Sequence, residues 1–319
     1  MVNVEAEMSS TQNVGQRLYN IIMSILECLI LLVRLILEGF VATVRIFTGV
    51  EAKDVSGDIV LITGAGHGIG KELAFQYVNL GCTVVCVDIN EADNKETVKE
   101  ANMLRKGTAY GYTCDVANWD KVLALSEKVK VEVGYVSLLI NNVGIMPTHP
   151  IEKHTPEEIK RLFDINVFSQ FWTLNAFLPQ MKEKGRGHIV SMSSIAGIVG
   201  LANLVPYCAS KFALRGMMEA LREEIRSGPY KNLIHTTTIF PYMVNTGLCK
   251  KPKVKFPMIL GLLDPKKVAA TIVDAQRKNL DEVTIPKGLM YMNNFFRILP
   301  LSCALMLVDY IDSGVESDM

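Results

Sequence analysis

The 319-residue sequence lacks any charge imbalance, because its 33 basic and 33 acidic side chains leave a formal net charge of zero. Without a basic field the chain has no electrostatic attraction for nucleic acid, which argues against a nucleic-acid partner. Its seven cysteines form no CxxC pair and its five histidines show no metal-ligand spacing, so no metal site is expected. Reduced, buried thiols in a domain that faces the cytosol are the expected state of the cysteines.

Long uncharged hydrophobic runs are missing as well. Residues 18–47 are mostly apolar but carry Glu27, Arg34, Glu38 and Arg45, which leaves no stretch of the roughly 17–25 uncharged residues that a simple span needs. Spacings of seven and four residues place these charges on one helical stripe. We expect an apolar amphipathic helix that lies in a membrane interface with its stripe in water. A helix packed on protein, and a tilted or hairpin insertion, are the alternatives.

The length suits one domain of about 230–260 residues with terminal extensions. Residues 1–17 are polar and expected to be disordered. Residues 57–286 carry the pattern of a folded domain, and residues 287–319 form an apolar extension with a polar tail. This extension is expected to cap a substrate pocket, to touch a membrane or to add a core helix.

Apolar segments with the length of buried strands alternate with helical patterns. The predicted strands are 58–63, 83–88, 109–115, 137–141, 188–194, 233–240 and 282–286. Alternation of this kind predicts an α/β fold, a doubly wound parallel sheet of the Rossmann type in a single domain. Thr155-Pro-Glu-Glu158 predicts a capping box that opens a long helix to about Lys184, with Asn166 inside it.

A glycine-rich turn follows the first predicted strand. Gly64, Gly68 and Gly70 fit the pattern TGxxxGxG, whereas Ile69 stands where GxGxxG needs a glycine. Such a turn lets the backbone approach a pyrophosphate at the N-terminus of the next helix. Asp88 ends the second predicted strand, eighteen residues after Gly70, where a carboxylate holds ribose hydroxyls and repels a 2′-phosphate. Neither of the next two residues is basic, so NAD is expected as the cofactor and NADP is disfavoured.

Tyr207 and Lys211 lie four residues apart, which places them on one face of a helix. A neighbouring ammonium favours the ionised phenol, so we expect Lys211 to lower the pKa of Tyr207 from about 10. The phenol can then exchange a proton with an alcohol or carbonyl near neutral pH. Ser194 ends the predicted buried strand 188–194, thirteen residues before Tyr207, at the sheet edge where reacting groups gather. The three side chains are expected to converge on one oxygen.

Together these motifs resemble the short-chain dehydrogenase/reductase family. The matching stretches follow the family's order and span about residues 57–286: Thr63–Gly70, Asn141–Gly144, Asn166, Ser194, Tyr207–Lys211 and Pro241–Thr246. The resemblance implies hydride transfer between a nicotinamide cofactor and an alcohol carbon. It implies that Tyr207 is the acid/base, that Ser194 binds the substrate oxygen, that Lys211 also holds the nicotinamide ribose, and that Asn166 supports a proton relay through water.

The cofactor-binding set implied by the resemblance is Gly64, Gly68, Ile69, Gly70, Asp88, Asp115, Val116, Asn141, Tyr207, Lys211 and Thr246. In that set Asp115 and Val116 flank the adenine, and Thr246 holds the nicotinamide amide. Two residues depart from the family pattern, because Val143 replaces an alanine and Tyr242 replaces a glycine. Residues 256–263 fall where the family has a mobile substrate lid.

Residues 57–70, 176–181 and 206–213, with the apolar N-terminal helix, resemble a membrane-associated branch of the family. That branch holds epidermal-type retinol dehydrogenases and lipid-droplet 17-beta-hydroxysteroid dehydrogenases, and residues 299–302 and 307–311 favour the former. The resemblance implies oxidation of all-trans-retinol to retinal, with a steroid or long-chain fatty alcohol dehydrogenase as the alternative. A non-catalytic lipid-droplet or membrane surface protein is the alternative of another class.

The same resemblance implies attachment to the endoplasmic reticulum membrane or a lipid droplet, with the catalytic domain facing the cytosol. It implies a lipophilic small-molecule substrate and, by analogy, a homodimer. The complete set of Asn166, Ser194, Tyr207 and Lys211 favours an enzyme over a scaffold.

Overall fold

The computed structural model describes the backbone of residues 2–318, and the side chains of these residues apart from 2–13, 42, 45–47, 258 and 259. The chain divides into two compact units, one that ends at Glu51 and one that begins at Ala52.

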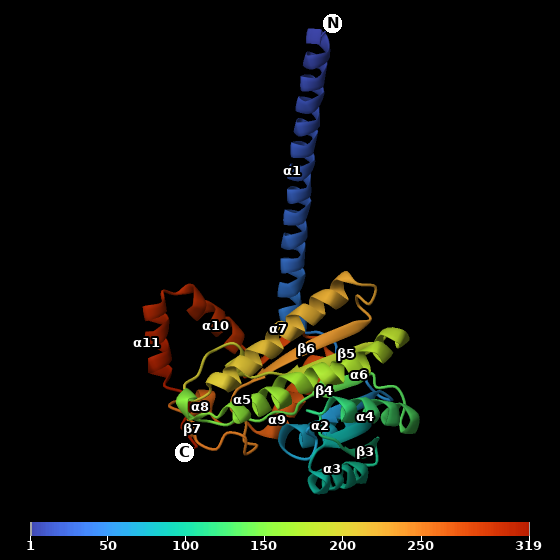
Figure 1. Cartoon of the computed structure of the whole chain (residues 1–319), viewed down its shortest axis with the longest axis vertical. Helices are drawn as coiled ribbons and strands as arrows, with labels where there is room; N and C mark the ends of the chain where they lie inside the picture. Colours follow the sequence, from blue (N-terminus) through green and yellow to red (C-terminus); the bar gives the residue numbers. More distant parts are fainter. Residues whose placement is uncertain (1, 319) are drawn as a thin grey trace. The chain divides into compact units, whose positions relative to one another are not determined.

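The first unit contains helix α1 (Val2–Thr48), the long ribbon at the N-terminal end of the chain in Figure 1. Its segment Val14–Val41 contains an 18-residue window with a mean hydropathy of 2.3 and is long and apolar enough to cross a membrane. Core helices and signal sequences share that property, so it does not decide between the alternatives for this segment. The large apolar side chains of this segment are exposed, apart from the half-buried Met23.

The helical backbone of α1 aligns Glu27, Arg34 and Glu38 on one side, because they are separated by seven and four residues. The Arg45 side chain, predicted to belong to the same stripe, lies outside the described residues. Helix α1 also includes the polar stretch predicted to be disordered, from residue 2 onward. The side chains of residues 2–13 lie outside the described part of the chain, so disorder of residues 1–17 stays a prediction.

The second unit is built on a sheet of seven parallel strands in the order β3-β2-β1-β4-β5-β6-β8. Each strand falls on a predicted one: β1 (Ile59–Thr63), β2 (Thr83–Asp88), β3 (Thr108–Thr113), β4 (Leu138–Asn141), β5 (Gly187–Met192), β6 (Ile234–Pro241) and β8 (Glu282–Ile285). The strand order reverses between β1 and β4, so the crevice beside their carboxyl ends is the expected ligand site. The predicted doubly wound parallel sheet is confirmed.

Helices cover both faces of the sheet. One face packs against α2 (Gly68–Asn79), α3 (Glu91–Met103) and α9 (Pro265–Arg277). The other packs against α4 (Trp119–Glu132), α6 (Ser169–Lys184) and α7 (Val205–Ser227). Every strand except β3 is buried along nearly its whole length, and β1, β2 and β4 are accordingly mostly apolar. Strands β5 and β6 carry buried His, Ser and Thr side chains among their apolar residues.

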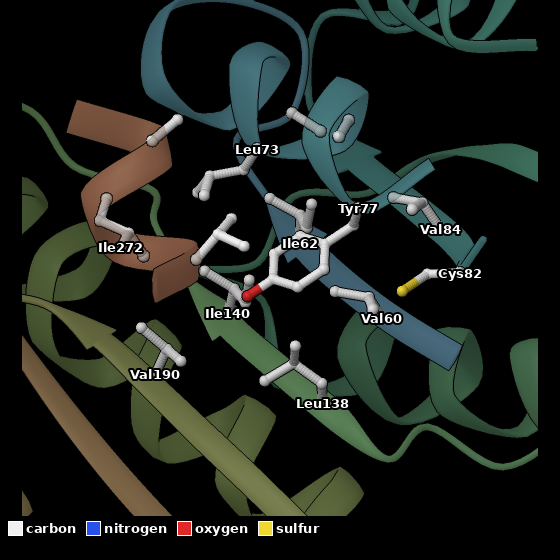
Figure 2. Packing of buried hydrophobic residues seen from close by; sticks show 14 of the residues in the cluster. Val60, Ile62, Leu73, Tyr77, Cys82, Val84, Leu138, Ile140, Val190 and Ile272 are labelled. Atoms are coloured by element: carbon white, nitrogen blue, oxygen red, sulfur yellow. The ribbon is translucent and has the colours of Figure 1, made fainter. Parts of the chain in front are cut away.

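Figure 2 shows the first of these cores, where Leu73 and Tyr77 of α2 and Ile272 of α9 meet the strand residues Ile62 and Ile140. The Tyr77 hydroxyl is satisfied in this apolar setting by Gln276 Oε1 at 3.2 Å. The packing holds α2 firmly against β1, which sets the position of the glycine turn between them.

The predicted long helix over 155–184 is divided in three: α5 (Pro156–Phe163), a π-helical turn η2 (Asp164–Phe168), and α6. Thr155 caps α5 as predicted, since its Oγ1 accepts from Glu158 N at 3.2 Å. The predicted capping box also requires the Glu158 carboxylate to accept from the backbone N–H of Thr155. That part of the prediction is wrong, because the carboxylate accepts from His149 and His154. Those imidazoles lie on the preceding loop, which includes the short helix η1 (Ile151–Lys153).

The C-terminal extension belongs to the second unit. It forms α10 (Leu289–Ile298) and α11 (Leu301–Ile311), and then the short strand β9 (Gly314–Val315), which pairs antiparallel with β7 (Pro252–Lys253). Strand β7 leads into α8 (Pro257–Leu260), in the stretch predicted to be the lid. Beyond β9, Asp318 N donates to Thr148 O at 2.8 Å, so the tail crosses from the lid to the loop after β4.

Candidate active site

Tyr207 and Lys211 lie one turn apart near the start of α7, and both are buried. Lys211 Nζ donates to the backbone oxygen of Met192, at the end of β5, at 2.9 Å. The same nitrogen lies 5.6 Å from the centre of the Tyr207 ring. Pro206 stands in the first turn of α7, where its missing N–H costs no helical hydrogen bond. The pair is therefore held between α7 and the carboxyl end of β5.

The pKa values of this pair differ from the sequence-based expectation. Burial raises the pKa of Tyr207 to about 12, and a hydrogen bond with the Ser194 side chain lowers it only in part. Burial also lowers the pKa of Lys211 to about 8. The expected depression of the Tyr207 pKa by Lys211 is wrong for this structure, because loss of water around the phenolate raises the pKa and Lys211 is not among the groups that lower it.

Ser194 lies two residues beyond β5 and caps the short helix η3 (Ile195–Gly197), its Oγ accepting from Ala196 N at 3.2 Å. Helix η3 packs directly on α7, since a Cβ on Gly197 would lie 2.8 Å from the backbone oxygen of Lys211. Ser193 Oγ also donates to that oxygen at 2.9 Å. These contacts keep Ser194 beside Tyr207, so the predicted meeting of the serine with the Tyr/Lys pair is present in the structure.

Asn166 lies in the π-helical turn η2 and is fully buried. Its Oδ1 accepts from Ile145 N at 2.8 Å and its Nδ2 donates to Ile145 O at 3.0 Å, so the amide holds the loop after β4 by both backbone groups. The next residue back, Gly144, lies close to Lys211, because a Cβ on it would be 3.5 Å from both Asn166 Oδ1 and Lys211 Nζ. A wide turn at such a position is typical of functional sites. The water relay from Asn166 to Lys211 stays a prediction.

The glycine turn joins β1 to α2 without side chains to obstruct it. A Cβ on Gly70 would lie 2.0 Å from Gly64 O, and Gly64 and Gly68 have φ of +67° and +58°, a region that favours glycine. Gly64, Gly68 and Ile69 line the cavity described below, at the N-terminus of α2. Exposed backbone N–H groups at a helix N-terminus fit a pyrophosphate, so these residues suit a dinucleotide.

Asp88 ends β2 and is buried against this turn. Its Oδ2 accepts from Gly66 N at 2.8 Å and its Oδ1 accepts from Asn90 N at 2.9 Å. Both carboxylate oxygens are thus held by backbone donors on the β2 side of the turn. A carboxylate fixed there suits the hydroxyls of an adenosine ribose.

Four further predicted residues lie at the carboxyl ends of neighbouring strands. Asp115 Oδ1 accepts from Ala117 N at 3.1 Å, and Val116 is buried beside it. Asn141 Oδ1 accepts from Thr173 Oγ1 at 2.7 Å. None of these three lines the cavity, whereas Thr246 does, close to Gly68.

A cavity of about 310 Å³ lies beside these groups, within the range of small-molecule sites. Ser194, Tyr207 and Lys211 form one part of its wall. The rest is mostly apolar, from Met146, Met192, Ile198, Leu201, Leu204, Met243, Leu248, Leu260, Leu289, Met292, Phe296, Val308 and Ile311. Helices α10 and α11 contribute several of these wall residues. The C-terminal extension therefore caps this cavity, which is the first of the three roles expected for it.

Sequence reasoning missed several residues of this wall. Asn142 lines the cavity, and its Nδ2 donates to the oxygens of Thr63 and Gly64, at 3.0 and 3.1 Å. The paired asparagines after β4 were the available signal, but only the first was assigned a role. Tyr242, which departs from the family's glycine, contacts the Ser313 hydroxyl of the tail. No sequence signal connected the tail with that loop.

The histidines are also more organised than the sequence indicated. Glu158 accepts from His149 Nε2 at 3.0 Å and from His154 Nδ1 at 2.6 Å, and the two rings lie 4.5 Å apart. These hydrogen bonds keep the pKa of Glu158 low although burial alone would raise it. Two imidazoles and a carboxylate within 4.8 Å have the chemistry of a metal-ligand set, which the spacing in the sequence did not reveal. The hydrogen bonds account for the cluster as a brace for the loop after β4.

A doubly wound sheet with a glycine turn, and with Ser, Tyr and Lys side chains beside an apolar cavity at its strand ends, is the architecture of an oxidoreductase with a nucleotide-binding fold. The family model described as short chain dehydrogenase matches residues 58–254. The chain therefore belongs to the short-chain dehydrogenase/reductase family. It is an oxidoreductase that acts on a CH–OH group and uses a nicotinamide cofactor.

Curated relatives narrow the branch. The chain is 43% identical to short-chain dehydrogenase/reductase family 16C member 6 of Bos taurus, over 83% of this chain and 84% of the relative. It is 39% identical to human epidermal retinol dehydrogenase 2, over 81% and 84%. It is 35% identical to human 17-beta-hydroxysteroid dehydrogenase 13, over 86% and 89%. The chain thus belongs to the retinol and steroid dehydrogenase branch.

Solved structures agree on the fold. A short-chain dehydrogenase/reductase from Burkholderia phymatum, in complex with NAD, matches with a TM-score of 0.68 at 22% identity, over 76% of this chain and 93% of that one. A metagenomic short-chain oxidoreductase in complex with NADP matches with a TM-score of 0.61 at 26% identity, over 73% and 97%. The two structures hold different nicotinamide cofactors.

Proposed function

We propose that the protein is an NAD-dependent dehydrogenase that oxidises a lipophilic alcohol, with all-trans-retinol as its leading substrate. The observation that carries the proposal is the apolar cavity that holds Ser194, Tyr207 and Lys211 next to the glycine turn. Burial of hydrocarbon supplies the binding energy in such a cavity, which suits a substrate dissolved in lipid. The named retinol and hydroxysteroid dehydrogenases among the relatives support the same class of substrate.

In this mechanism the Ser194 and Tyr207 hydroxyls, which are hydrogen-bonded to each other, bind one substrate oxygen. Tyr207 takes the hydroxyl proton as the neighbouring carbon loses a hydride, and a bound nicotinamide ring supplies the hydride acceptor. Lys211, whose pKa is about 8, is mostly protonated at pH 7 and stabilises the phenolate that oxidation requires. Asn166 acts as a positioning residue through the loop at Ile145.

A turnover assay on membranes that contain the full chain tests this proposal. With NAD we expect oxidation of all-trans-retinol, and lower rates with a hydroxysteroid, a long-chain fatty alcohol and a short water-soluble alcohol. A higher kcat/KM for a hydroxysteroid or a long-chain fatty alcohol than for retinol would favour the alternative function, a steroid or fatty alcohol dehydrogenase. Binding of dinucleotide without turnover of any lipophilic alcohol, with NAD or NADP, would identify the surface-protein alternative.

The cofactor preference is expected to favour NAD by at least tenfold in kcat/KM. Asp88 is buried with both oxygens held by backbone donors, so it cannot easily turn away from a 2′-phosphate, and like charges in contact cost several kcal/mol. Asp88→Asn should raise the NADP/NAD ratio of kcat/KM about tenfold or more. Asp120→Asn, the same charge change on α4, is the control. If the unaltered protein uses both cofactors with equal kcat/KM, Asp88 does not discriminate between a ribose 2′-hydroxyl and a 2′-phosphate.

We also propose that α1 lies on the cytosolic surface of the endoplasmic reticulum membrane or of a lipid droplet. The stripe of Glu27, Arg34 and Glu38 suits a helix with one side in water. At about 1.5 Å per residue, residues 18–47 extend over roughly 45 Å, more than a perpendicular span requires. This placement brings the catalytic unit to a substrate dissolved in lipid.

The two placements of α1 differ in where the N-terminus lies. An interfacial helix leaves it on the side of the catalytic unit, whereas a single crossing puts it on the opposite side. We expect a protease-sensitive tag before Met1 to be digested together with the catalytic unit when sealed microsomes are treated with protease. Protection of the tag during digestion of the catalytic unit would show that α1 spans the membrane. Detergent-opened microsomes, in which both are cut, are the control.

A further inference from the structure

Asn293 lies on α10, the helix that caps the cavity, and lines the cavity wall. Its side chain is only 7% exposed. The amide nitrogen is fully buried and has no hydrogen-bond partner among the described residues. No hydrogen bond to a described residue involves the amide oxygen either. The amide oxygen is not among the fully buried atoms, so the nitrogen alone is an enclosed donor without a partner among the described residues, on a side chain that lines the cavity.

Other polar side chains near this position are satisfied or solvated. Arg297, one turn further along α10, donates to the backbone oxygen of Ile198 at 2.8 Å. Asn142, the other asparagine of the cavity wall, donates to two backbone oxygens. Asn294, the next residue on α10, points to solvent. The state of Asn293 is thus not a general property of α10 or of the cavity.

Enclosing an amide without a partner is unfavourable, because the group loses its hydrogen bonds to water and gains none. Such a group in a native fold calls for an explanation. The position supplies one, because the neighbouring cavity residues of α10 are the apolar Leu289, Met292 and Phe296. A ligand that fills this apolar space could satisfy the amide with an oxygen of its own.

The reacting oxygen of the substrate has other partners. Ser194 and Tyr207 come from the end of β5 and from α7, whereas Asn293 comes from the C-terminal cap. The Ser194/Tyr207 pair and Asn293 therefore lie on separate elements, and among the described residues that line the cavity Asn293 alone has a fully buried side-chain nitrogen or oxygen without a partner. A molecule that matches both is an apolar body with two oxygens, one that reacts and one that does not.

We propose that Asn293 forms a subsite for a second oxygen, a hydroxyl or keto group remote from the reacting carbon of a lipophilic alcohol. The amide both donates and accepts, so either group fits. This inference rests on the proposed dehydrogenase function and refines it within each skeleton, so that a retinoid alcohol with a second oxygen on its ring is a better substrate than all-trans-retinol itself. It selects alcohols that carry the second oxygen over otherwise identical alcohols that lack it, because the latter leave the buried amide unpaired.

Two matched pairs of alcohols test the subsite in the full chain with NAD. One pair is a hydroxysteroid with a second oxygen on its far ring and the same steroid without it. The other is all-trans-retinol hydroxylated on its ring and all-trans-retinol itself. For the skeleton that the enzyme turns over better, we expect the second oxygen to raise kcat/KM about ten- to a hundredfold.

Asn293→Leu, which keeps similar volume and removes the amide, should bring that ratio to within about twofold of one. Asn294→Leu, the same change on the exposed side of α10, should leave the ratio as it is. A structural role for the amide predicts a lower melting temperature for ligand-free Asn293→Leu, whereas the subsite predicts an unchanged or higher one, since an unpaired buried amide is removed.

Ligand-dependent melting temperatures of the unaltered chain give a readout that needs neither turnover nor a folded variant. In the presence of the dinucleotide, the alcohol with the second oxygen should raise the melting temperature more than its partner in the pair. The subsite proposal is wrong if the two alcohols of a pair give equal kcat/KM and equal rises in melting temperature. It is also wrong if Asn293→Leu leaves the preference for the second oxygen unchanged. Absence of turnover together with the expected difference in melting shift refutes the dehydrogenase and keeps the subsite.

Discussion

Replacing Tyr207 by Phe is expected to lower kcat for alcohol oxidation by roughly a hundred- to ten-thousandfold, the contribution typical of a positioned acid or base. The variant should still fold and bind the dinucleotide. Phe keeps the ring, which packs in a buried cluster with Leu162, Ala196 and Leu204, and loses only the hydroxyl. That hydroxyl is the group we assign to the proton transfer, and its hydrogen bond joins it to Ser194.

The measurement combines NADH formation with a separate titration of NADH binding by protein fluorescence. Tyr77→Phe is a matched control, because it also removes one buried hydroxyl, the partner of Gln276 in the core beside α2. That control should lose about 1 kcal/mol of stability and keep its kcat. Substantial turnover by folded Tyr207→Phe would assign the proton transfer to another group.

The fold could be predicted from the sequence because its signals are local. Parallel strands buried on both faces are rich in apolar residues, and six such segments, with the half-exposed β3 and the helical patterns between them, leave few arrangements other than a doubly wound sheet. The glycine turn could also be predicted from the sequence. The positive φ of Gly64 and the close approach of Gly70 to Gly64 O leave no room for a side chain at either position. The Tyr207/Lys211 pair required only helical spacing.

The remaining features depend on contacts between segments that are distant in the sequence. The pKa of Tyr207 follows from its burial, which no motif reports. Glu158 has the position of a capping-box residue, but two imidazoles on the preceding loop take its carboxylate. The apolar C-terminal extension could not be assigned to the cavity from its composition, because the same residues would suit a core helix or a membrane surface. Asn293, inside that extension, therefore carried no signal at all.

Replacing Lys211 by Met is expected to raise the free energy of unfolding at pH 7 while it lowers turnover. The ammonium is buried, and burial lowers its pKa to about 8 from 10.5. That difference corresponds to about 3 kcal/mol of unfavourable burial of the charged form. Loss of the charge-assisted hydrogen bond to Met192 O offsets about 1–2 kcal/mol of this, so we expect a net gain of roughly 1–2 kcal/mol. Functional groups commonly lower stability in this way.

The pH dependence supplies the decisive measurement. Below pH 8 both the folded and the unfolded chain hold the Lys211 proton, so the whole cost of burying the ammonium is present. Between about pH 8 and 10.5 the unfolded chain binds more protons than the folded one, so this residue's contribution to stability rises with pH. Unfolding by urea should therefore show an advantage of Lys211→Met at pH 7 that shrinks or reverses by pH 10.

Other titrating groups are common to both proteins and cancel in this difference. Lys121→Met, the same substitution at an exposed position of α4, should change stability by no more than about 0.5 kcal/mol at either pH. If Lys211→Met is instead less stable than the unaltered chain at pH 7, the ammonium contributes to folding through its contacts with Met192 and the Tyr207 ring. In that case the lysine stabilises the strand end that it shares with Ser194, and its retention needs no catalytic explanation. The expected result, a more stable and inactive variant, means that the fold tolerates a buried charge because the proton transfer at Tyr207 requires it.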